Sequence, residues 1–503
     1  MEGHIESATH LPFAEFLGQF KNCLKSLFHV ENDINQLGLR RGLPSELLGE
    51  IMAFNPLATF IPQDFGGRGG QVREGLALAS AASYESLALS LTFGINWALF
   101  LQPVAKYGAK DVRAVIFDSF LRNQKMGGLM ITEPDYGSDA LRMKSFFTRE
   151  EDTFHLQGTK HWAGLTGMAD YWLLTAREKT ASGDLMRDID FFICDTSSGE
   201  QQIVVEEFFE NLGLYMIPYG RNRIDVRIPN IQRLIPKSSG IKMMLDILHR
   251  SRLQFPGMAT GFVQRMLDEG LAHCRDRQVG GMNLASYDQV QQRLARLQGS
   301  FTICSAMCHY STERADPAND LSSAGLEANA IKTVATDLMQ EASQSLLQLV
   351  GAKGYRLDHI AGRGTVDSRP FQIFEGSNDI LYIQISEAVL KLMKRAREKN
   401  LFTFLSGFDL TCRAVDSLKT WLDFDPGSPL AQRQLVTLGR VFGRIITMGF
   451  VLGLGDRGFR SDLITNSLSM LRQDIASQMG AYSAAELTNV VDEYQDGGCW
   501  FTC

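Results

Sequence analysis

The segment HLQGTKHWAGLTGMADYWLLTAR, residues 155–177, contains two short runs rich in aromatic and β-branched or bulky apolar residues, divided by a glycine-containing turn. Runs of this length and composition are typical of β-strands. Three similar runs follow at residues 190–196, 201–208 and 222–229. Together they predict an antiparallel sheet in the middle of the chain.

The chain on either side of this sheet has the spacing of helices. Residues 12–28, PFAEFLGQFKNCLKSLF, repeat apolar side chains every three or four positions, as an amphipathic helix does. Long amphipathic segments return near Ser239, and one of them stops at Gly351. The order helices, sheet, helices favours an α+β fold with separate layers over alternating βαβ units.

The chain of 503 residues is too long for one ordinary hydrophobic core, so several domains are expected. The changes in periodicity predict an N-terminal helical domain at residues 1–125 and a middle β-domain at residues 126–237. A C-terminal helical bundle at residues 238–398 and an additional helical extension at residues 399–503 complete the predicted organisation.

Composition excludes some classes of function. The net charge of −7 argues against a general nucleic-acid-binding protein, which needs a basic face. Eight scattered cysteines without a CxxC pair suit free thiols in a reducing compartment. The N-terminus lacks the pattern of a signal peptide, and the apolar residues 445–455 are too few to cross a bilayer. We therefore expect a cytoplasmic protein without a transmembrane segment.

The segment FQIFEGSNDILYI, residues 371–383, places one carboxylate, Glu375, in an otherwise apolar run. Apolar neighbours remove a carboxylate from water and raise its pKa, which suits a catalytic base. The alternative is an acid that caps the following helix. Because Ser377 or Asn378 would cap that helix better, the catalytic interpretation is favoured.

Four other motifs are weaker when each is taken alone. ITEPDYGSDA, residues 131–140, is either a donor-rich nest for a ligand or a polar turn. QLVGAKGY, residues 348–355, is either a phosphate-binding turn or a helix stop, and Arg277 either holds a phosphate or ends a helix. GLGDRG, residues 453–458, matches a dinucleotide fingerprint but follows a helical pattern, which favours a helix end.

Taken in order, these motifs resemble the acyl-CoA dehydrogenase family over roughly residues 10–395. The resemblance rests on TEPDYGSD, GTKHWAGLTGMADYWLLTAR, a helix that ends in Arg277, QLVGAKGY and FQIFEGSNDI. It implies an N-terminal helical domain, a middle β-domain and a C-terminal four-helix bundle, with FAD between the last two. Longer members carry an added helical domain where two dimers would meet, so the extension implies a homodimer.

The resemblance also implies a role for individual residues. Glu375 falls at the position of the catalytic base, whereas Ser251, at the alternative position of that base, has no carboxylate. Arg277, Gln348 and Gly351 would reach the FAD pyrophosphate from a neighbouring subunit. The other residues implied to bind FAD are Leu129, Thr132, Trp162, Gly164, Ser377 and Asp379, and those implied to bind substrate are Ser138, Arg252, Phe374 and Gly376.

The implied reaction is the α,β-dehydrogenation of an acyl thioester, carried by coenzyme A or an acyl-carrier protein, to the trans-2-enoyl thioester. Glu375 would remove the α-proton while a hydride passes from the β-carbon to flavin N5, and an electron-transfer flavoprotein or another acceptor would reoxidise the flavin. An oxidase that uses oxygen is one alternative. A flavin-free binding protein is another, because Gly164 and Gly280 replace a hydroxyl residue and an aromatic residue that the family usually has.

Overall fold

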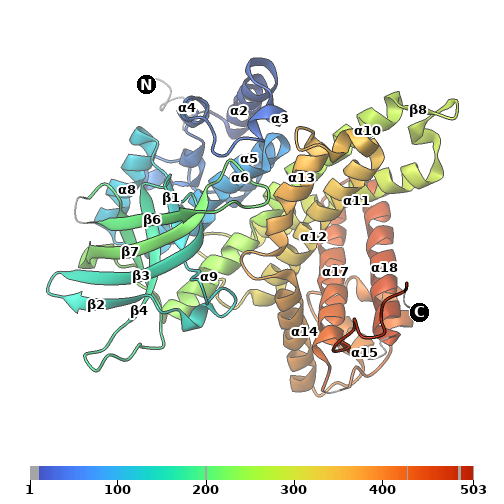
Figure 1. Ribbon diagram of the computed structural model, residues 1–503. Helices are drawn as coiled ribbons and strands as arrows, with labels where there is room; N and C mark the ends of the chain where they lie inside the picture. The colour runs from blue at the N-terminus through green and yellow to red at the C-terminus, as the bar shows by residue number, and fades with distance from the viewer. Residues whose placement is uncertain (1–10, 199–200, 428, 485–488, 502–503) are drawn as a thin grey trace.

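The computed structural model describes residues 11–198, 201–427, 429–484 and 489–501. A β-sheet lies at one end of the molecule, and helices from both ends of the chain lie beside it and extend away from it (Figure 1). This arrangement of separate helical and sheet layers confirms the α+β fold class.

The N-terminal part is helical. One feature stands out at its centre, where the π-type turn η4 (Ile95–Leu101) joins helices α6 and α7. Residues Leu87–Thr92 of α6 are all buried, as expected for a segment that is apolar on every side. The helices are α2 (Phe13–Ser26), α3 (Ile34–Leu37), α4 (Ser45–Ala53), α5 (Val72–Glu85), α6 (Leu87–Gly94), α7 (Gln102–Tyr107) and α8 (Lys110–Asn123).

The five predicted runs all form strands, but the sheet is mixed and not purely antiparallel. Strands β1 and β2 both pair with β4 in parallel, and the remaining pairs are antiparallel. A parallel pair needs a long crossover, which local periodicity does not reveal. The strands are β1 (Gly127–Met130), β2 (Phe146–Glu150), β3 (Thr153–Gly164), β4 (Tyr171–Glu178), β5 (Asp190–Asp195), β6 (Gln202–Phe208) and β7 (Tyr219–Pro229).

The helical part that follows the sheet begins with α9 (Gly240–Arg252) and α10 (Phe255–Asp276). The two helices are separate because Pro256 is tolerated only in the first turn of a helix. Helices α10, α11, α12 and α14 then pack together as a bundle. The helices are α9 (Gly240–Arg252), α10 (Phe255–Asp276), α11 (Asp288–Arg314), α12 (Gly325–Val350), α13 (Ile360–Ser368) and α14 (Asn378–Arg395).

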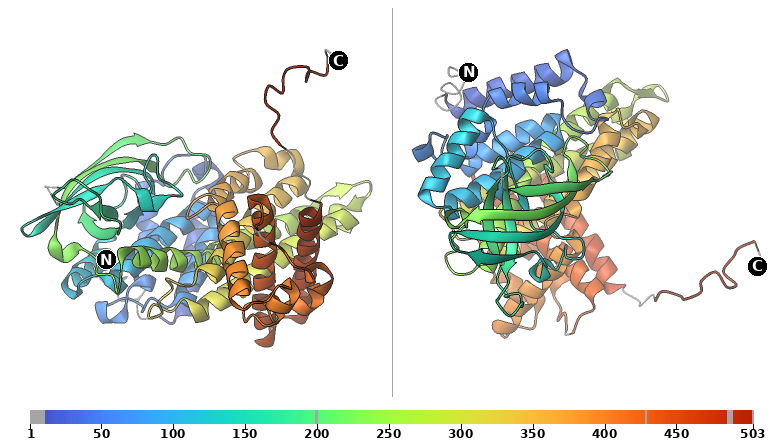
Figure 2. Two further views of the ribbon diagram at one scale, coloured as in Figure 1. Left: turned by 90° about the horizontal axis from the view of Figure 1, so that it is seen from below. Right: turned by 60° about the vertical axis from the view of Figure 1, so that its left-hand side comes forward.

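The C-terminal extension enlarges this bundle. Helix α17 (Gln432–Asp456) packs against α11, α12 and α14, and α18 (Ser461–Ser483) packs against α11 and α17. Figure 2 shows both helices on the side of the bundle away from the sheet. Residues 453–458 lie at the end of α17 with no strand before them, which confirms the helix-end interpretation. The short helices α15 (Leu401–Ser406) and α16 (Lys419–Leu422) precede them.

Two helical spans, Leu87–Tyr107 and Gln432–Asp456, are long and apolar enough to cross a membrane by length and composition alone. Residues 445–455, which were expected to be too short, belong to the second of them. In the folded protein 89% of the apolar window of the first span and 61% of that of the second are buried. Core helices of this kind pass the same test of length and composition.

Candidate active site

A cavity of about 400 Å³ lies where the N-terminal helices, the sheet and the bundle meet. Its walls come from α6 and η4, from the ends of β1 and β3, and from α9 and α14. Predicted site residues from segments far apart in the chain therefore line one cavity. Those that line it are Leu129, Thr132, Ser138, Trp162, Gly164, Arg252, Phe374, Glu375 and Gly376.

Glu375 stands in a tight turn before α14. Its backbone has φ of 52°, in the left-handed region that few non-glycine residues adopt, and Gly376 follows with φ of 93°. The Ser251 hydroxyl donates a hydrogen bond of 2.7 Å to Oε1 of Glu375. Oε2 is buried and has no hydrogen-bond partner among the described residues. One oxygen of the carboxylate is thus held, and the other has no hydrogen-bond partner from the described residues.

Burial raises the pKa of Glu375 above its ordinary value. The hydrogen bond from Ser251 and the positive charges of Arg252 and Lys332 act in the opposite direction. A carboxylate with a raised pKa is a stronger base than one in water, provided that it is still ionised at working pH. The environment of Glu375 therefore suits the removal of a weakly acidic proton.

Two buried cations hold the backbone of this turn. Arg252 donates to the Glu375 carbonyl oxygen from Nε and Nη2, at 3.1 and 2.7 Å, and to Asn329 from Nη1 at 2.7 Å. Lys332 donates to the Gly376 carbonyl oxygen at 2.8 Å. The resemblance implies that Arg252 lies near the nucleotide end of coenzyme A. In the structure its guanidinium supports the turn of Glu375, and Arg252 also lines the cavity.

A buried ion pair supports another part of the cavity lining. Lys160, with a side chain 1% exposed, donates to Glu133 at 3.0 Å and to the Ile131 carbonyl oxygen at 3.2 Å. Burial lowers the pKa of Lys160 to about 8, and Glu133 opposes that shift. Glu133 also accepts the backbone N–H groups of Lys144 and Ser145. The loop that carries Thr132 and Ser138 is therefore anchored at both ends.

The end of β3 forms a third wall. Trp162, at a bulge in the β3–β7 pairing, has φ of 56° and is 53% exposed, with Phe209 packed against it at 4.5 Å between ring centroids. A Cβ atom at Gly164 would lie 2.8 Å from Ile95 Cδ1 and 3.3 Å from the Tyr219 ring. The packing of these neighbours explains why glycine stands there.

Models of two domains match consecutive parts of the chain: the acyl-CoA dehydrogenase middle domain at residues 128–226 and its C-terminal domain at residues 238–390. Together they cover about half of the sequence. The chain belongs to the acyl-CoA dehydrogenase family. The matched regions contain the sheet, α9 and the turn of Glu375, which build most of the cavity.

Individual members of the family are distant. A probable acyl-CoA dehydrogenase of Mycobacterium leprae is 25% identical over 71% of this chain and 90% of its own length. The very long-chain specific acyl-CoA dehydrogenase of mouse mitochondria is 22% identical over 74% of this chain, which spans only 57% of that protein. A Bacillus anthracis acyl-CoA dehydrogenase complexed with FAD superposes with a TM-score of 0.75 at 15% identity, covering 95% of this chain and 89% of that one.

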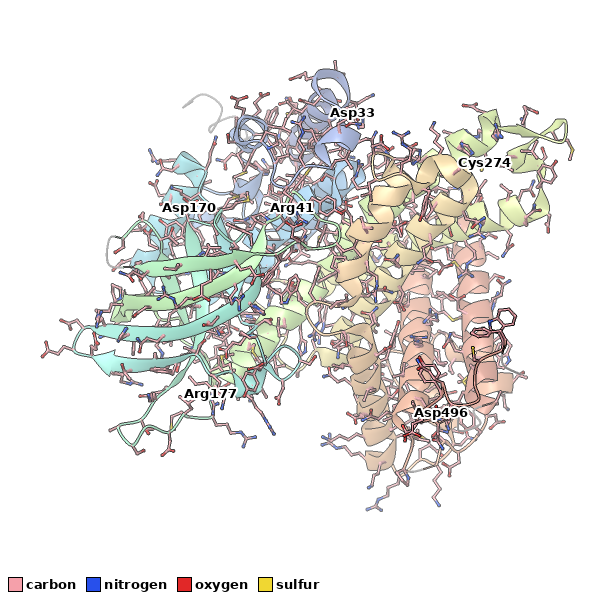
Figure 3. The ribbon with its side chains drawn as sticks, viewed as in Figure 1. Asp33, Arg41, Asp170, Arg177, Cys274 and Asp496 are labelled. Carbon is pink, nitrogen blue, oxygen red and sulfur yellow. The ribbon has the colours of Figure 1, made fainter. Side chains whose placement is uncertain are left out.

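Other site residues implied by the family resemblance do not line the cavity. Arg277 and Gly351 stand at the C-terminal ends of α10 and α12, and Gln348 is an exposed residue of the last turn of α12. Cys274, three positions before Arg277, marks this end of the bundle, away from the sheet (Figure 3). Ser377 is the N-cap of α14, and Asp379 is exposed and paired with Arg440 at 3.4 Å.

Sequence reasoning missed several residues of the cavity. Ile95, Leu99, Leu248 and Tyr219 supply apolar or aromatic wall, and His249 lies beside them. No motif marks them, because they belong to helices and a strand whose buried faces look alike in sequence. Met244 also lines the cavity, whereas Met243, Met258 and Met266 are core residues outside it.

Proposed function

We propose that the protein is an FAD-dependent dehydrogenase that introduces a trans-2 double bond into an acyl thioester. The observation that carries this proposal is the carboxylate of Glu375. It is desolvated, it has one oxygen without a partner, and it lines the same cavity as Trp162 and Thr132. Few structural roles account for such a carboxylate, because an unpaired buried oxygen destabilises the fold.

FAD fits the residues that are present. Thr132, Leu129, Trp162 and Gly164 surround one side of the cavity and would hold the flavin ring, with Trp162 exposed and Gly164 presenting no side chain. When bound, FAD supplies the acceptor for a hydride. Ser377 and Asp379, at the start of α14, would lie on the flavin side of the site, and Ser377 forms no side-chain cap that would have to break.

The steps that the protein's own atoms perform follow from the turn of Glu375. Oε2 takes the α-proton of the thioester while Ser251 holds Oε1 in place. The backbone N–H of Glu375 donates no hydrogen bond within the described chain and is therefore available to the thioester oxygen. A donor at that oxygen stabilises the enolate charge as it develops. Desolvation of the cavity strengthens both interactions.

The acyl group is expected to follow the apolar wall. Leu91, Ile95 and Leu99 from α6 and η4 line the cavity together with Leu245 and Leu248 from α9. Such a wall binds hydrocarbon in proportion to the area buried and offers few polar partners. Ser138, Phe374 and Gly376 border the same space and would contact the thioester and its carrier. Coenzyme A is the proposed carrier, with an acyl-carrier protein as the alternative, and an electron-transfer flavoprotein is the proposed acceptor.

A second copy of the chain would complete the cofactor site. Arg277 and Gly351 lie at an end of the bundle that the cavity does not reach, so they would serve FAD only from a neighbouring subunit. Burial lowers the pKa of His273 most, and the charges of Lys353 and Arg277 lower it further. These basic groups therefore lie near one another. A cluster of cations suits a pyrophosphate. We propose a homodimer, which light scattering in solution tests.

The experiment that tests the proposed function replaces Glu375 with glutamine. The E375Q protein should keep its flavin and its visible spectrum but lose about 10²–10⁴-fold in the rate at which an acyl-CoA bleaches the flavin. Glu387, an exposed residue of α14, the helix that follows the turn of Glu375, provides the matched control as E387Q. Bleaching by E375Q at the wild-type rate would remove Glu375 from the mechanism. A pure wild-type protein without flavin, which takes up none on addition of FAD, would support a binding protein instead.

A further inference from the structure

Lys332, in the first third of α12, is fully buried and lies beside the turn that carries Glu375. Its Nζ donates to the Gly376 carbonyl oxygen at 2.8 Å and to Asn378 Oδ1 at 2.9 Å. Neither acceptor is a carboxylate. A buried ammonium without a bonded anion is costly, so its presence in this core calls for an explanation beyond packing.

We propose that Lys332 is a positioning residue for catalysis, which holds the turn of Glu375 in its left-handed conformation by binding the Gly376 carbonyl and the first residue of α14. The inference rests on the proposed function of Glu375. Lys332 does not line the cavity in which the substrate would bind. It acts through the backbone that carries the base.

The conformation of the turn is what needs support. Glu375 is left-handed although it has a side chain, and such residues persist only where their surroundings impose the conformation. Hydrogen bonds within the turn supply little of that constraint, since the N–H groups of Glu375, Gly376 and Ser377 donate to no atom in the described part of the chain. The carbonyl oxygens of Glu375 and Gly376 are instead held from outside, by Arg252 and Lys332.

The two carbonyl bonds also orient the amides. In a trans peptide the N–H points opposite to the C=O. The N–H of Gly376 therefore points away from Arg252, and the N–H of Ser377 points away from Lys332 and the interior of the bundle. Successive N–H groups in a turn of this kind form a concave donor site. Holding Gly376 thus orients the backbone donors beside Glu375 as well as the carboxylate itself.

Asn378 makes the attachment rigid. It accepts from Lys332 and donates to Thr336 at 3.0 Å and to Asp337 at 2.7 Å. Tyr382, one turn further along α14, donates to the other oxygen of Asp337 at 2.6 Å. The start of α14 is therefore tied to α12 by one polar network, and Lys332 is the member of it that reaches the turn of Glu375.

Lys332 also influences the charge of the base. Burial lowers the pKa of Lys332 to about 7, and the charges of Glu375 and Asp337 oppose this shift while Arg252 adds to it. Among the described residues, these three are the charged groups that shift its pKa. A protonated Lys332 in turn lowers the pKa of Glu375. Removing the ammonium should therefore move the pH at which Glu375 ionises upwards.

The test replaces Lys332 with methionine, which fills a similar volume without a donor. Hydrogen exchange of residues 371–381, followed by mass spectrometry, should become faster in K332M than in the wild type, because the turn loses its anchor. In the purified flavin-containing protein, the rate of flavin bleaching by an acyl-CoA should fall by up to about 10²-fold. The acidic limb of its pH profile should move to higher pH, and binding of the acyl-CoA should change much less.

Lys106 provides a matched control. It is another largely buried lysine, bonded to Asp246 at 2.9 Å and outside the cavity. K106M should destabilise the fold yet leave both the exchange of residues 371–381 and the position of the acidic limb unchanged. Should K332M fail to fold, Lys332→Gln carries the test, since it keeps an N–H donor and should give an intermediate loss.

Two results would overturn the proposal. One is unchanged exchange of residues 371–381 in the folded variant, and the other is a bleaching rate and pH profile equal to those of the wild type. The exchange measurement needs no substrate. If none of the acyl thioesters tested bleaches the flavin of the wild-type protein, the proposed function fails. The exchange result still decides whether Lys332 holds the turn.

Discussion

The Ser251 hydroxyl lies 2.7 Å from Oε1 of Glu375 and donates a hydrogen bond to it. The family resemblance identifies these two residues as the alternative positions for the catalytic base. The structure shows that they adjoin in space although 124 positions separate them in sequence. In the proposed mechanism one position carries the base, and the other carries a donor that fixes its orientation and stabilises its charged form.

Replacing Ser251 with alanine should therefore shift the pH dependence of the reaction. The hydrogen bond from Ser251 lowers the pKa of Glu375, so its loss raises that pKa. The base works only when ionised, and the acidic limb of the pH profile should move upwards by about one to two pH units, the worth of a hydrogen bond to a charged group. Stopped-flow bleaching of the flavin between roughly pH 5 and 9, the range in which such a base is expected to titrate, measures the shift of the acidic limb.

The control for this prediction is Ser305→Ala, which removes a hydroxyl bonded only to the backbone of its own helix at the Phe301 carbonyl oxygen. Its pH profile should match that of the wild type. An acidic limb of S251A at the wild-type pH would show that Ser251 does not tune the base.

Replacing Lys160 with methionine should destabilise the protein strongly. Glu133 would remain buried, 4% exposed at its side chain, without its cation, and the loss of one partner of a buried pair costs about 3–5 kcal/mol. Urea unfolding measures the change. The double variant K160M/E133Q should recover part of the stability, because the unpaired charge is gone. Equal stability of K160M and wild type would contradict the anchoring role of this pair.

His249 should make stability depend on pH. Burial lowers its pKa from 6.5 to about 4, with the Leu321 carbonyl oxygen 2.7 Å from Nδ1. The unfolded chain binds a proton on this histidine near pH 6.5 and the folded chain does not, so stability decreases as pH falls from 6.5 towards 4. The full effect is about 3 kcal/mol at most, at roughly 1.4 kcal/mol per pH unit.

The variant His249→Asn keeps a donor near Nδ1 but does not titrate. The difference in unfolding free energy between wild type and H249N should therefore change with pH in that window and remain constant above it. Urea titrations at several pH values provide this difference. If this difference in unfolding free energy did not change between roughly pH 4 and 7, the histidine would have the same pKa in the folded and unfolded states.

Restoring a hydroxyl residue at Gly164 should be unfavourable. The new Cβ would lie 2.8 Å from Ile95 Cδ1, and overpacking of this kind costs typically about 1–3 kcal/mol. The double variant G164T/I95A should recover stability because it removes the obstructing atoms. Thermal unfolding compares the four proteins of the cycle. A G164T protein as stable as the wild type would show that the wall adapts freely.

The main layers of the fold were predictable because helices and strands differ in the period of their apolar residues. The five strands from residue 155 onwards and the helix stop at Gly351 follow from local composition. The parallel pairing of β1 and β2 with β4 did not, since it depends on a crossover and not on the strands themselves.

Glu375 illustrates the division within the site. Its apolar neighbours and the glycine beside it are sequence features, and they sufficed to single it out as the candidate base. The hydrogen bond from Ser251, the two cations that hold its turn and the leucines that face it come from α9, α12 and η4. Only folding brings those segments together. Sequence determined which group titrates, and tertiary packing decided its partners, because desolvation and charge act through space and not along the chain.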